Sequence, residues 1–254
     1  MPHFAPRAVM PIARIKDTTF HREVYEPAED SFLLVDALAA EWRSTLRLRP
    51  PRVVVEVGCG TGYVIVSAAL LAREHESSRE EPMDDDAAAE ATTSAASTGT
   101  PSCRFYATDV NRDALEATRA TAAAHDVAHL LETHECDLLS APGLLESLRN
   151  KTDVLLFNPP YVLTPSEEVT LGGVAAAWAG GKDGREVTDR LLPLVFDVLA
   201  PGGTFLLILL EQNKPSEVKK MLEKFGLVCD VVATTSADEE RLHVMRARKP
   251  PIRP

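Results

Sequence analysis

The sequence predicts a single α/β domain built on a doubly wound, mostly parallel sheet. Apolar runs of strand length alternate along the chain with stretches whose apolar residues are spaced as in amphipathic helices. The apolar runs are rich in valine and leucine and are continuous, which is typical of strands buried on both faces between two layers of helices. A chain of 254 residues, 45% of them hydrophobic, is long enough to bury such a core.

Strands are expected wherever an apolar run ends at turn-forming or polar residues. Residues 52–58 read "RVVVEVG", and residues 153–158 read "DVLLFN" before two prolines that have no N–H to donate to a strand ladder. The expected strands are 52–58, 104–110, 129–135, 153–158, 203–210, 227–234 and 241–248.

Helices are expected between these runs. Residues 24–42 begin with favourable helix-start chemistry, because Pro27 suits a first turn and the charges of Glu29 and Asp30 complement the positive end of the helix dipole. A Pro-Gly-Gly stop signal at 201–203 follows another expected helix. The remaining expected helices are 111–126, 188–200 and 217–226.

Residues 76–102 carry much of the negative charge of the chain. They hold seven acids against one arginine, a net of −6, so the rest of the chain carries −11 − (−6) = −5. This segment has no aromatic residue and is rich in Ala, Ser and Thr, which predicts a disordered, low-complexity insertion in the single domain 1–254. A flexible basic tail is expected at about 249–254. The mildly acidic remainder lacks the basic face that a duplex-binding protein needs, so no nucleic-acid partner is expected.

Composition also bears on the location of the protein. No stretch approaches the roughly 18 apolar residues of a membrane span, and residues 1–17 lack the apolar core of a secretory signal. We therefore expect a cytoplasmic protein without a membrane partner, and leave a nuclear pool open. No metal site and no disulfide are expected, because the four cysteines are widely spaced and form no C-x-x-C pair.

The run "VVVEVGCGTG" is a strand that leads into an acid and three alternate glycines. These residues are Glu56, Gly58, Gly60 and Gly62. Glycines at a strand-to-helix turn let a ligand approach the backbone and the free N–H groups of the helix start. A pyrophosphate does not need a carboxylate beside it, whereas a ligand with an ammonium group does. The loop therefore favours S-adenosylmethionine (SAM) over NAD.

Two further acids follow the next two expected strands. Asp109 lies 47 residues after Gly62 (109 − 62), and subtracting the 27 residues of 76–102 leaves 20, the spacing of an acid that holds ribose hydroxyls. Asp137 is a candidate for the adenine amino group, with a helix cap or plain loop acid as the alternative.

The turn "NPPY" at the end of the 153–158 strand is the candidate catalytic centre. An amide or aromatic amino nitrogen is a poor nucleophile, because its lone pair is delocalised. The Asn158 side-chain oxygen and the Pro159 carbonyl are expected to accept from such an NH2 group, Pro160 to stiffen the turn, and Tyr161 to stack on the substrate. The rate would come from positioning and electrostatic preorganisation rather than from a strong base.

These motifs resemble the HemK-type class I methyltransferases, which modify the glutamine of a Gly-Gly-Gln loop in peptide-release factors. The resemblance covers nearly the whole chain outside 76–102 and is closest to the eukaryotic and archaeal branch. It implies the class I, Rossmann-like fold, with a seven-stranded, mostly parallel sheet and an antiparallel C-terminal strand. It rests on "VYEPAEDSFLLVDAL" (24–38), "EVGCGTG" (56–62), "TDVN" (108–111), "FNPPYV" (157–162) and "AAWAGGKDGREVTDRLLP" (176–193).

The resemblance further implies site residues and partners. The residues that would contact SAM are Ser31, Glu56, Gly58, Asp109, Asp137 and Leu138, and those that would hold the target glutamine are Asn158, Pro159, Pro160 and Tyr161, with Tyr25 close by. The implied partner is a small zinc-binding activator protein that forms a heterodimer with the enzyme, and the implied substrate is a class 1 release factor. If 129–135 is the edge strand of the sheet, it leaves an edge for another chain to cover.

Three other functions remain open from sequence. DNA adenine N6-methylation uses the same turn, but it normally requires a basic cleft or a target-recognition domain. Lysine methylation fits less well, because a lysine must first lose a proton and the turn offers amide acceptors. A catalytically silent SAM-binding scaffold would predict damage in the turn or the glycine loop, and both are intact.

Overall fold

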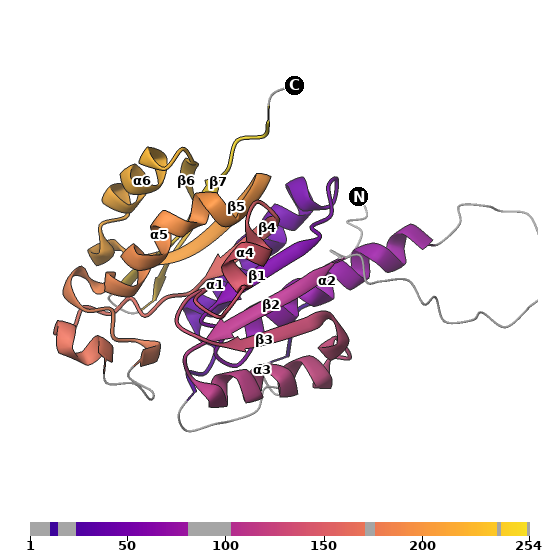
Figure 1. The fold of residues 1–254 in the computed structure, drawn as a ribbon, viewed down its shortest axis with the longest axis horizontal. Helices are drawn as coiled ribbons and strands as arrows, with labels where there is room; N and C mark the ends of the chain where they lie inside the picture. The colour runs from indigo at the N-terminus through magenta and orange to yellow at the C-terminus, as the bar shows by residue number, and fades with distance from the viewer. Residues whose placement is uncertain (1–10, 15–23, 81–102, 171–175, 238–239, 253–254) are drawn as a thin grey trace, which may run out of the picture.

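A computed structural model describes residues 11–14, 24–80, 103–170, 176–237 and 240–252 of the chain. These residues form a seven-stranded sheet with the order β3-β2-β1-β4-β5-β7-β6 (Figure 1). The strands are β1 (Val53–Val57), β2 (Arg104–Asp109), β3 (Leu131–Glu135), β4 (Thr152–Phe157), β5 (Leu199–Leu210), β6 (Val228–Ala237) and β7 (Glu240–Arg248).

The sheet confirms the expected class I topology. Strands β1 to β5 pair in parallel with their neighbours, whereas β7 is antiparallel to both β5 and β6. The one strand that runs against the others is therefore the C-terminal one. Because the parallel strands end at the same edge, the residues after β1, β2 and β4 are brought together there.

Helices cover both faces of this sheet. They are α1 (Glu29–Glu41), α2 (Tyr63–Glu80), α3 (Arg112–Ala124), α4 (Leu144–Leu148), α5 (Glu186–Val198) and α6 (Pro215–Lys224), with a π-helical turn η2 (Trp42–Leu46) and the 3-10 turns η3 (Ala128–Leu130), η4 (Ser166–Thr170), η6 (Lys182–Gly184) and η7 (Glu211–Asn213). No helix within the described ranges is long and apolar enough to cross a membrane.

The two layers of helices explain why the apolar runs are continuous. Val54 and Leu156 pack in a core with α1, α2 and α3, whereas their chain neighbours Val55 and Leu155 pack in a second core with α4, α5 and α6. Side chains of a strand alternate between faces, so a strand covered on both faces needs apolar residues at every position.

Some expected boundaries are wrong. Strand β5 begins at Leu199 and runs through the Pro-Gly-Gly signal, since a Cβ at Gly203 would lie 2.7 Å from the Thr152 carbonyl oxygen and only glycine allows this close approach. Pro27 lies before the helix rather than in its first turn, because the N-cap is Ala28; Glu29 and Asp30 do occupy that turn.

The residues at which the insertion and the tail were expected to begin are also wrong. Helix α2 continues through Glu80, so residues 76–80 are helical, while 81–102 lie outside the described residues. Lys249 does not belong to a flexible tail: its ammonium group donates to Asn150 Oδ1 (2.6 Å) and to the Phe196 carbonyl (2.7 Å), and the residue is buried. Residues 253–254 are outside the described part.

Candidate active site

A cavity of about 630 Å³ opens at the carboxyl ends of β1, β2 and β4. Every site residue expected from the sequence lines it, except Gly62. The expected residues found there are Tyr25, Ser31, Glu56, Gly58, Gly60, Asp109, Asp137, Leu138, Asn158, Pro159, Pro160 and Tyr161. Segments far apart in the sequence therefore meet at one edge of the sheet.

The glycine loop between β1 and α2 is anchored to the neighbouring strand. The N–H groups of Gly58 and Cys59 both donate to the Thr108 carbonyl at 2.8 and 3.0 Å. Gly58 and Gly60 have φ values of +67° and +52°, in the left-handed region that side chains disfavour. The loop thus brings its backbone to the cavity wall without side chains in the way.

Gly62 has a different reason to be glycine. Its φ is +80°, and a Cβ there would lie 2.8 Å from the Thr118 Cα. Gly62 is not among the residues that line the cavity, and its lack of a Cβ permits α3 to pack against the start of α2. Spacing alone could not separate the two roles.

The Glu56 carboxylate is buried at the base of the cavity. Its Oε2 accepts from the Ile65 N–H at 2.9 Å, and the residue is 2% exposed. Burial raises the pKa of Glu56 well above its usual value, and the nearby charge of Asp109 adds to this. A carboxylate in such a position is suited to a ligand that brings its own positive charge.

Asp109 ends β2 beside the glycine loop. Its Oδ2 accepts from the Gly60 N–H at 3.1 Å and its Oδ1 from the Asn111 N–H at 2.9 Å. Burial raises the pKa of this carboxyl as well. Each oxygen keeps a further lone pair, so the carboxylate can still accept from hydroxyl groups of a ligand.

Asp137 and Leu138 form the wall beyond β3. The Asp137 carboxylate makes an ion pair with Arg190 of α5, and both side chains are about half exposed. Leu138 has a φ of +54° and is 9% exposed. Arg190 is the one lysine or arginine among the described residues that line the cavity, whereas five acids line it: Asp30, Glu56, Asp109, Asp137 and Glu240. The cavity is suited to a cationic ligand.

Asn158 follows β4 and presents an unused acceptor. Its Nδ2 donates to Ser31 Oγ at 3.5 Å, while its buried Oδ1 has no hydrogen-bond partner in the described part of the chain. Ser31 Oγ itself donates to Asp30 Oδ1 at 3.1 Å, which leaves its lone pair toward Asn158 and fixes the orientation of the amide. A buried acceptor without a donor indicates a place for a ligand N–H.

Tyr161 is held by a residue that the sequence did not single out for the site. Its hydroxyl donates to Asp30 Oδ2 at 2.9 Å, and Asp30 Oδ1 accepts from the Ser31 N–H at 2.6 Å. Burial and the Asp30 charge raise the pKa of Tyr161, and the same causes raise the pKa of Tyr25 to about 12. Both tyrosines are therefore neutral donors at physiological pH. The sequence identified Asp30 only as a helix-start acid.

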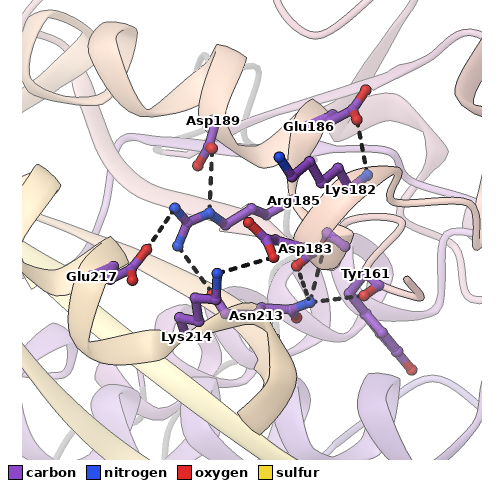
Figure 2. A network of polar contacts seen from close by, with 10 residues as sticks. Tyr161, Lys182, Asp183, Arg185, Glu186, Asp189, Asn213, Lys214 and Glu217 are labelled. Carbon is purple, nitrogen blue, oxygen red and sulfur yellow. Dashed lines mark hydrogen bonds and ion pairs between the residues drawn. The ribbon is translucent and has the colours of Figure 1, made fainter. Parts of the chain in front are cut away.

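The chain after the turn adds a wall that sequence reasoning also missed. Val162 donates to the Trp178 carbonyl at 3.0 Å and accepts from the Gly180 N–H at 2.8 Å. This pairing places Trp178, which is 38% exposed, in the cavity lining. Figure 2 shows Asn213, whose amide contacts the Tyr161 carbonyl. The only available signal was that Trp178 lies in one of the motifs used for the family resemblance.

Comparisons with known proteins agree with this geometry. A sequence model described as the RMKL-like methyltransferase domain matches residues 37–172. "Methyltransferase HEMK2" of Homo sapiens is 38% identical over 227 residues, which cover 89% of this chain and 90% of that protein. The "eRF1 methyltransferase catalytic subunit mtq2" of Schizosaccharomyces pombe is 28% identical, with 89% of each chain covered.

Solved structures share the fold. A methyltransferase from Pyrococcus furiosus has a TM-score of 0.57 at 20% identity, covering 92% of this chain and 89% of that one. The Mtq2 structure from E. cuniculi, described as a Mtq2-Trm112 complex that methylates eRF1, has a TM-score of 0.54 at 23% identity, covering 89% of this chain and 99% of that one. With an acidic cavity beside a glycine loop and an Asn-Pro-Pro-Tyr turn at the end of β4, the chain belongs to the HEMK2 family of HemK-type class I methyltransferases and uses SAM as its methyl donor.

Proposed function

We propose that this protein transfers a methyl group from SAM to the side-chain amide nitrogen (N5) of the glutamine in the Gly-Gly-Gln motif of a class 1 peptide-release factor. The observation that carries the proposal is the buried Oδ1 of Asn158 in the wall of the cavity, an acceptor for which none of the described residues supplies a donor. An amide NH2 group is a donor of matching polarity and planar shape.

The cofactor end of the cavity is formed by the ends of β1, β2 and β3. When bound, SAM supplies an electrophilic methyl group on a positively charged sulfur. Glu56 would hold the ammonium group, Asp109 would accept from the ribose hydroxyls, and the loop with Gly58 and Gly60 would admit the ligand close to the backbone. Asp137, Leu138 and Ser31 would complete the contacts. The low exposure of Glu56 and the acidic lining support this assignment.

The substrate end is formed by the Asn158–Tyr161 turn. Asn158 Oδ1 and the Pro159 carbonyl would accept from the glutamine NH2 group and orient its lone pair toward the methyl group, while Pro160 limits the conformations of the turn. The sulfur–methyl bond would break as the nitrogen–carbon bond forms, S-adenosylhomocysteine would leave, and the methylated nitrogen would lose one of its two protons to solvent. Tyr161 and Tyr25 would contact the planar amide. Because the groups assigned to contact the nitrogen are an amide oxygen and a backbone carbonyl rather than a strong base, the rate would arise from alignment and from acceptors already in place where positive charge develops.

The names of relatives support a release factor as the substrate. The fission yeast relative is described as an eRF1 methyltransferase subunit, and the Mtq2 structure is described as acting on the same factor. Release factors act on ribosomes, so we place this activity in the cytoplasm. The acidic cavity offers no basic groove for a nucleic-acid backbone.

A small partner protein is part of the proposal. The Mtq2 structure is described as a complex with Trm112, and in this chain β3 is an edge strand whose end is followed by the partly buried Cys136. We propose that a small activator covers this edge and that it binds zinc. Copurification of the two chains, with metal analysis of the partner, tests both statements; a stable enzyme alone with an unbound, zinc-free partner would contradict them.

The decisive experiment measures where the methyl group goes. The chain is coexpressed with its partner, supplied with labelled SAM, and offered a release factor, the same factor with its Gly-Gly-Gln glutamine changed to alanine, and duplex DNA. We expect label in the first substrate alone. Equal label in the alanine variant, or label in DNA, would overturn the proposed function.

A further inference from the structure

We propose that Asn213 is a positioning residue for the Asn158–Tyr161 turn, although it does not line the cavity. Asn213 ends η7, which follows β5, and its side chain is fully buried. Its Nδ2 donates to the carbonyls of Tyr161 (2.9 Å), Asp183 (3.0 Å) and Gly184 (3.2 Å), and its Oδ1 accepts from the Leu210 N–H at 2.7 Å (Figure 2). Two amide protons are thus shared among three carbonyl oxygens.

The turn depends on such an external anchor. Pro159 and Pro160 have no N–H groups and so cannot fix the chain by backbone donation. The hydrogen bond from Asn213 to the Tyr161 carbonyl fixes the backbone directly after them. The Tyr161 hydroxyl is fixed separately by Asp30, so this residue is held at both its backbone and its side-chain end.

The anchor itself is held in place by neighbouring charges. Arg185 donates to the Asn213 carbonyl at 3.2 Å, and its guanidinium pairs with Glu217 (2.9 Å) and Asp189 (3.3 Å) (Figure 2). Arg185 is only 12% exposed, so this arrangement is less open to solvent than an ordinary surface ion pair. The backbone of Asn213 therefore has little freedom to follow a displaced Tyr161.

Glycine at position 184 is needed for Tyr161 and Asn213 to come into contact beside it. Gly184 has a φ of +65°, and a Cβ there would overlap both the Tyr161 carbonyl oxygen and the Asn213 amide nitrogen. The network therefore brings the end of β5, the turn after β4 and the η6 turn into direct contact. Because Glu56 and Asp109 lie on other strands, loss of this contact should displace the substrate end of the cavity and leave the cofactor end unchanged.

The first test is Asn213→Asp, which keeps the size of the side chain and the acceptor for Leu210. It replaces the donor with an oxygen that faces three carbonyl oxygens. With the release factor as substrate, we expect kcat to fall by about 100-fold, as for a misplaced reacting group, with SAM affinity unchanged. The control is Asn150→Ala, which removes the partner of Lys249 at the start of β4, far from the carboxyl ends of the strands, and should leave kcat unchanged.

A second variant covers the case in which Asn213→Asp does not fold. Gly184→Ala inserts a methyl group between Tyr161 and Asn213 while both of these residues remain. Gly143→Ala is its matched control, because Gly143 has a φ of +75° and, apart from its two chain neighbours, no described residue has an atom within 4 Å of a Cβ there. Both changes carry the same backbone strain, and only Gly184→Ala should lower kcat.

This inference rests on the proposed function for its rate readout, so a second readout is independent of substrate. The N–H groups of Val162 and Thr164 donate to the carbonyls of Trp178 (3.0 Å) and Gly181 (3.1 Å). With SAM bound, hydrogen exchange at these two amides should become faster in Asn213→Asp and Gly184→Ala than in the controls. Unchanged exchange, or a loss of SAM affinity that equals the loss of kcat, would overturn the positioning role. If the wild type does not methylate the release factor, the proposed function fails, and the exchange comparison still decides the role of Asn213.

Discussion

The Tyr161 hydroxyl donates a 2.9 Å hydrogen bond to Asp30 Oδ2, joining two residues that lie 131 positions apart in the chain. Asp30 is 3% exposed and also accepts from Ser31. The first turn of α1 is therefore attached to the turn after β4, and Ser31 in turn contacts Asn158. A displacement of α1 would therefore displace Tyr161 and Asn158, two residues of this turn that we assign to substrate binding.

Removing the Tyr161 hydroxyl tests this attachment. Tyr161→Phe keeps the aromatic ring but removes the donor to Asp30 Oδ2, while Oδ1 still accepts from Ser31. A hydrogen bond to a charged group contributes about 1.5–3 kcal/mol to stability. We expect a loss of this size in denaturant unfolding and a fall in kcat of up to about 100-fold from misplacement of the turn. Tyr106→Phe, outside the cavity, is the control. An unchanged kcat would mean that Tyr161 acts by stacking alone.

Asn158→Ala tests the acceptor itself. The change removes Oδ1 from the substrate end, and we expect methyl transfer to fall by at least about 100-fold, the size of effect seen when one preorganised catalytic hydrogen bond is deleted. SAM should still bind, as measured by calorimetry, because Glu56 and Asp109 are untouched. Loss of SAM binding in this variant would place Asn158 at the cofactor end instead.

Glu56→Gln should act in opposite directions on stability and on SAM binding. Burial raises the pKa of Glu56, so the empty fold disfavours the charged carboxylate. A neutral glutamine, which can still accept from the Ile65 N–H, should raise the melting temperature of the empty protein near neutral pH. The same change should weaken SAM binding, because the negative charge for the ammonium group is lost. A lower melting temperature together with unchanged affinity would contradict both parts.

The raised pKa of Glu56 also makes stability and SAM affinity depend on pH. A carboxyl whose folded pKa is raised binds more protons in the native than in the unfolded state, so the stability of the empty protein falls as pH rises from the unfolded pKa of about 4.5 through the folded one. Asp109, whose pKa is also raised, contributes in the same direction. SAM affinity should instead decrease as pH falls through the raised pKa. Unfolding curves measured from about pH 5 to about pH 8, with and without SAM, give the free energy of unfolding at each pH. This free energy should change less steeply with pH in Glu56→Gln than in the wild type.

The ion pair between Asp137 and Arg190 predicts a gain of function. If Asp137 contacts the adenine amino group, Arg190→Ala frees its carboxylate, and SAM affinity should rise by up to about fivefold, since a half-exposed ion pair is worth only about 0.2–1 kcal/mol. Weaker SAM binding in Arg190→Ala would show that the arginine itself contacts the cofactor.

Much of the fold could be predicted because its signals are local. Continuous apolar runs predicted strands covered on both faces. The structure confirms this, because the neighbouring residues Val54 and Val55 pack in the two different cores and both positions must therefore be apolar. Boundaries were less accurate where packing decided them. The polar sequence of 76–80 continues α2, and a Pro-Gly-Gly stretch lies inside β5 because Gly203 permits close approach to Thr152.

By itself, the sequence determined which segments along the chain form strands and helices, and it determined the glycine loop and the Asn-Pro-Pro-Tyr turn. Each of these depends on residues that are neighbours in the chain. Only the tertiary structure decided that Asp30 and Asn213 hold Tyr161 from two sides, that Arg190 pairs with Asp137, and that Gly62 accommodates α3. These contacts join residues from different elements, and a local pattern carries no information about which distant element will supply a partner.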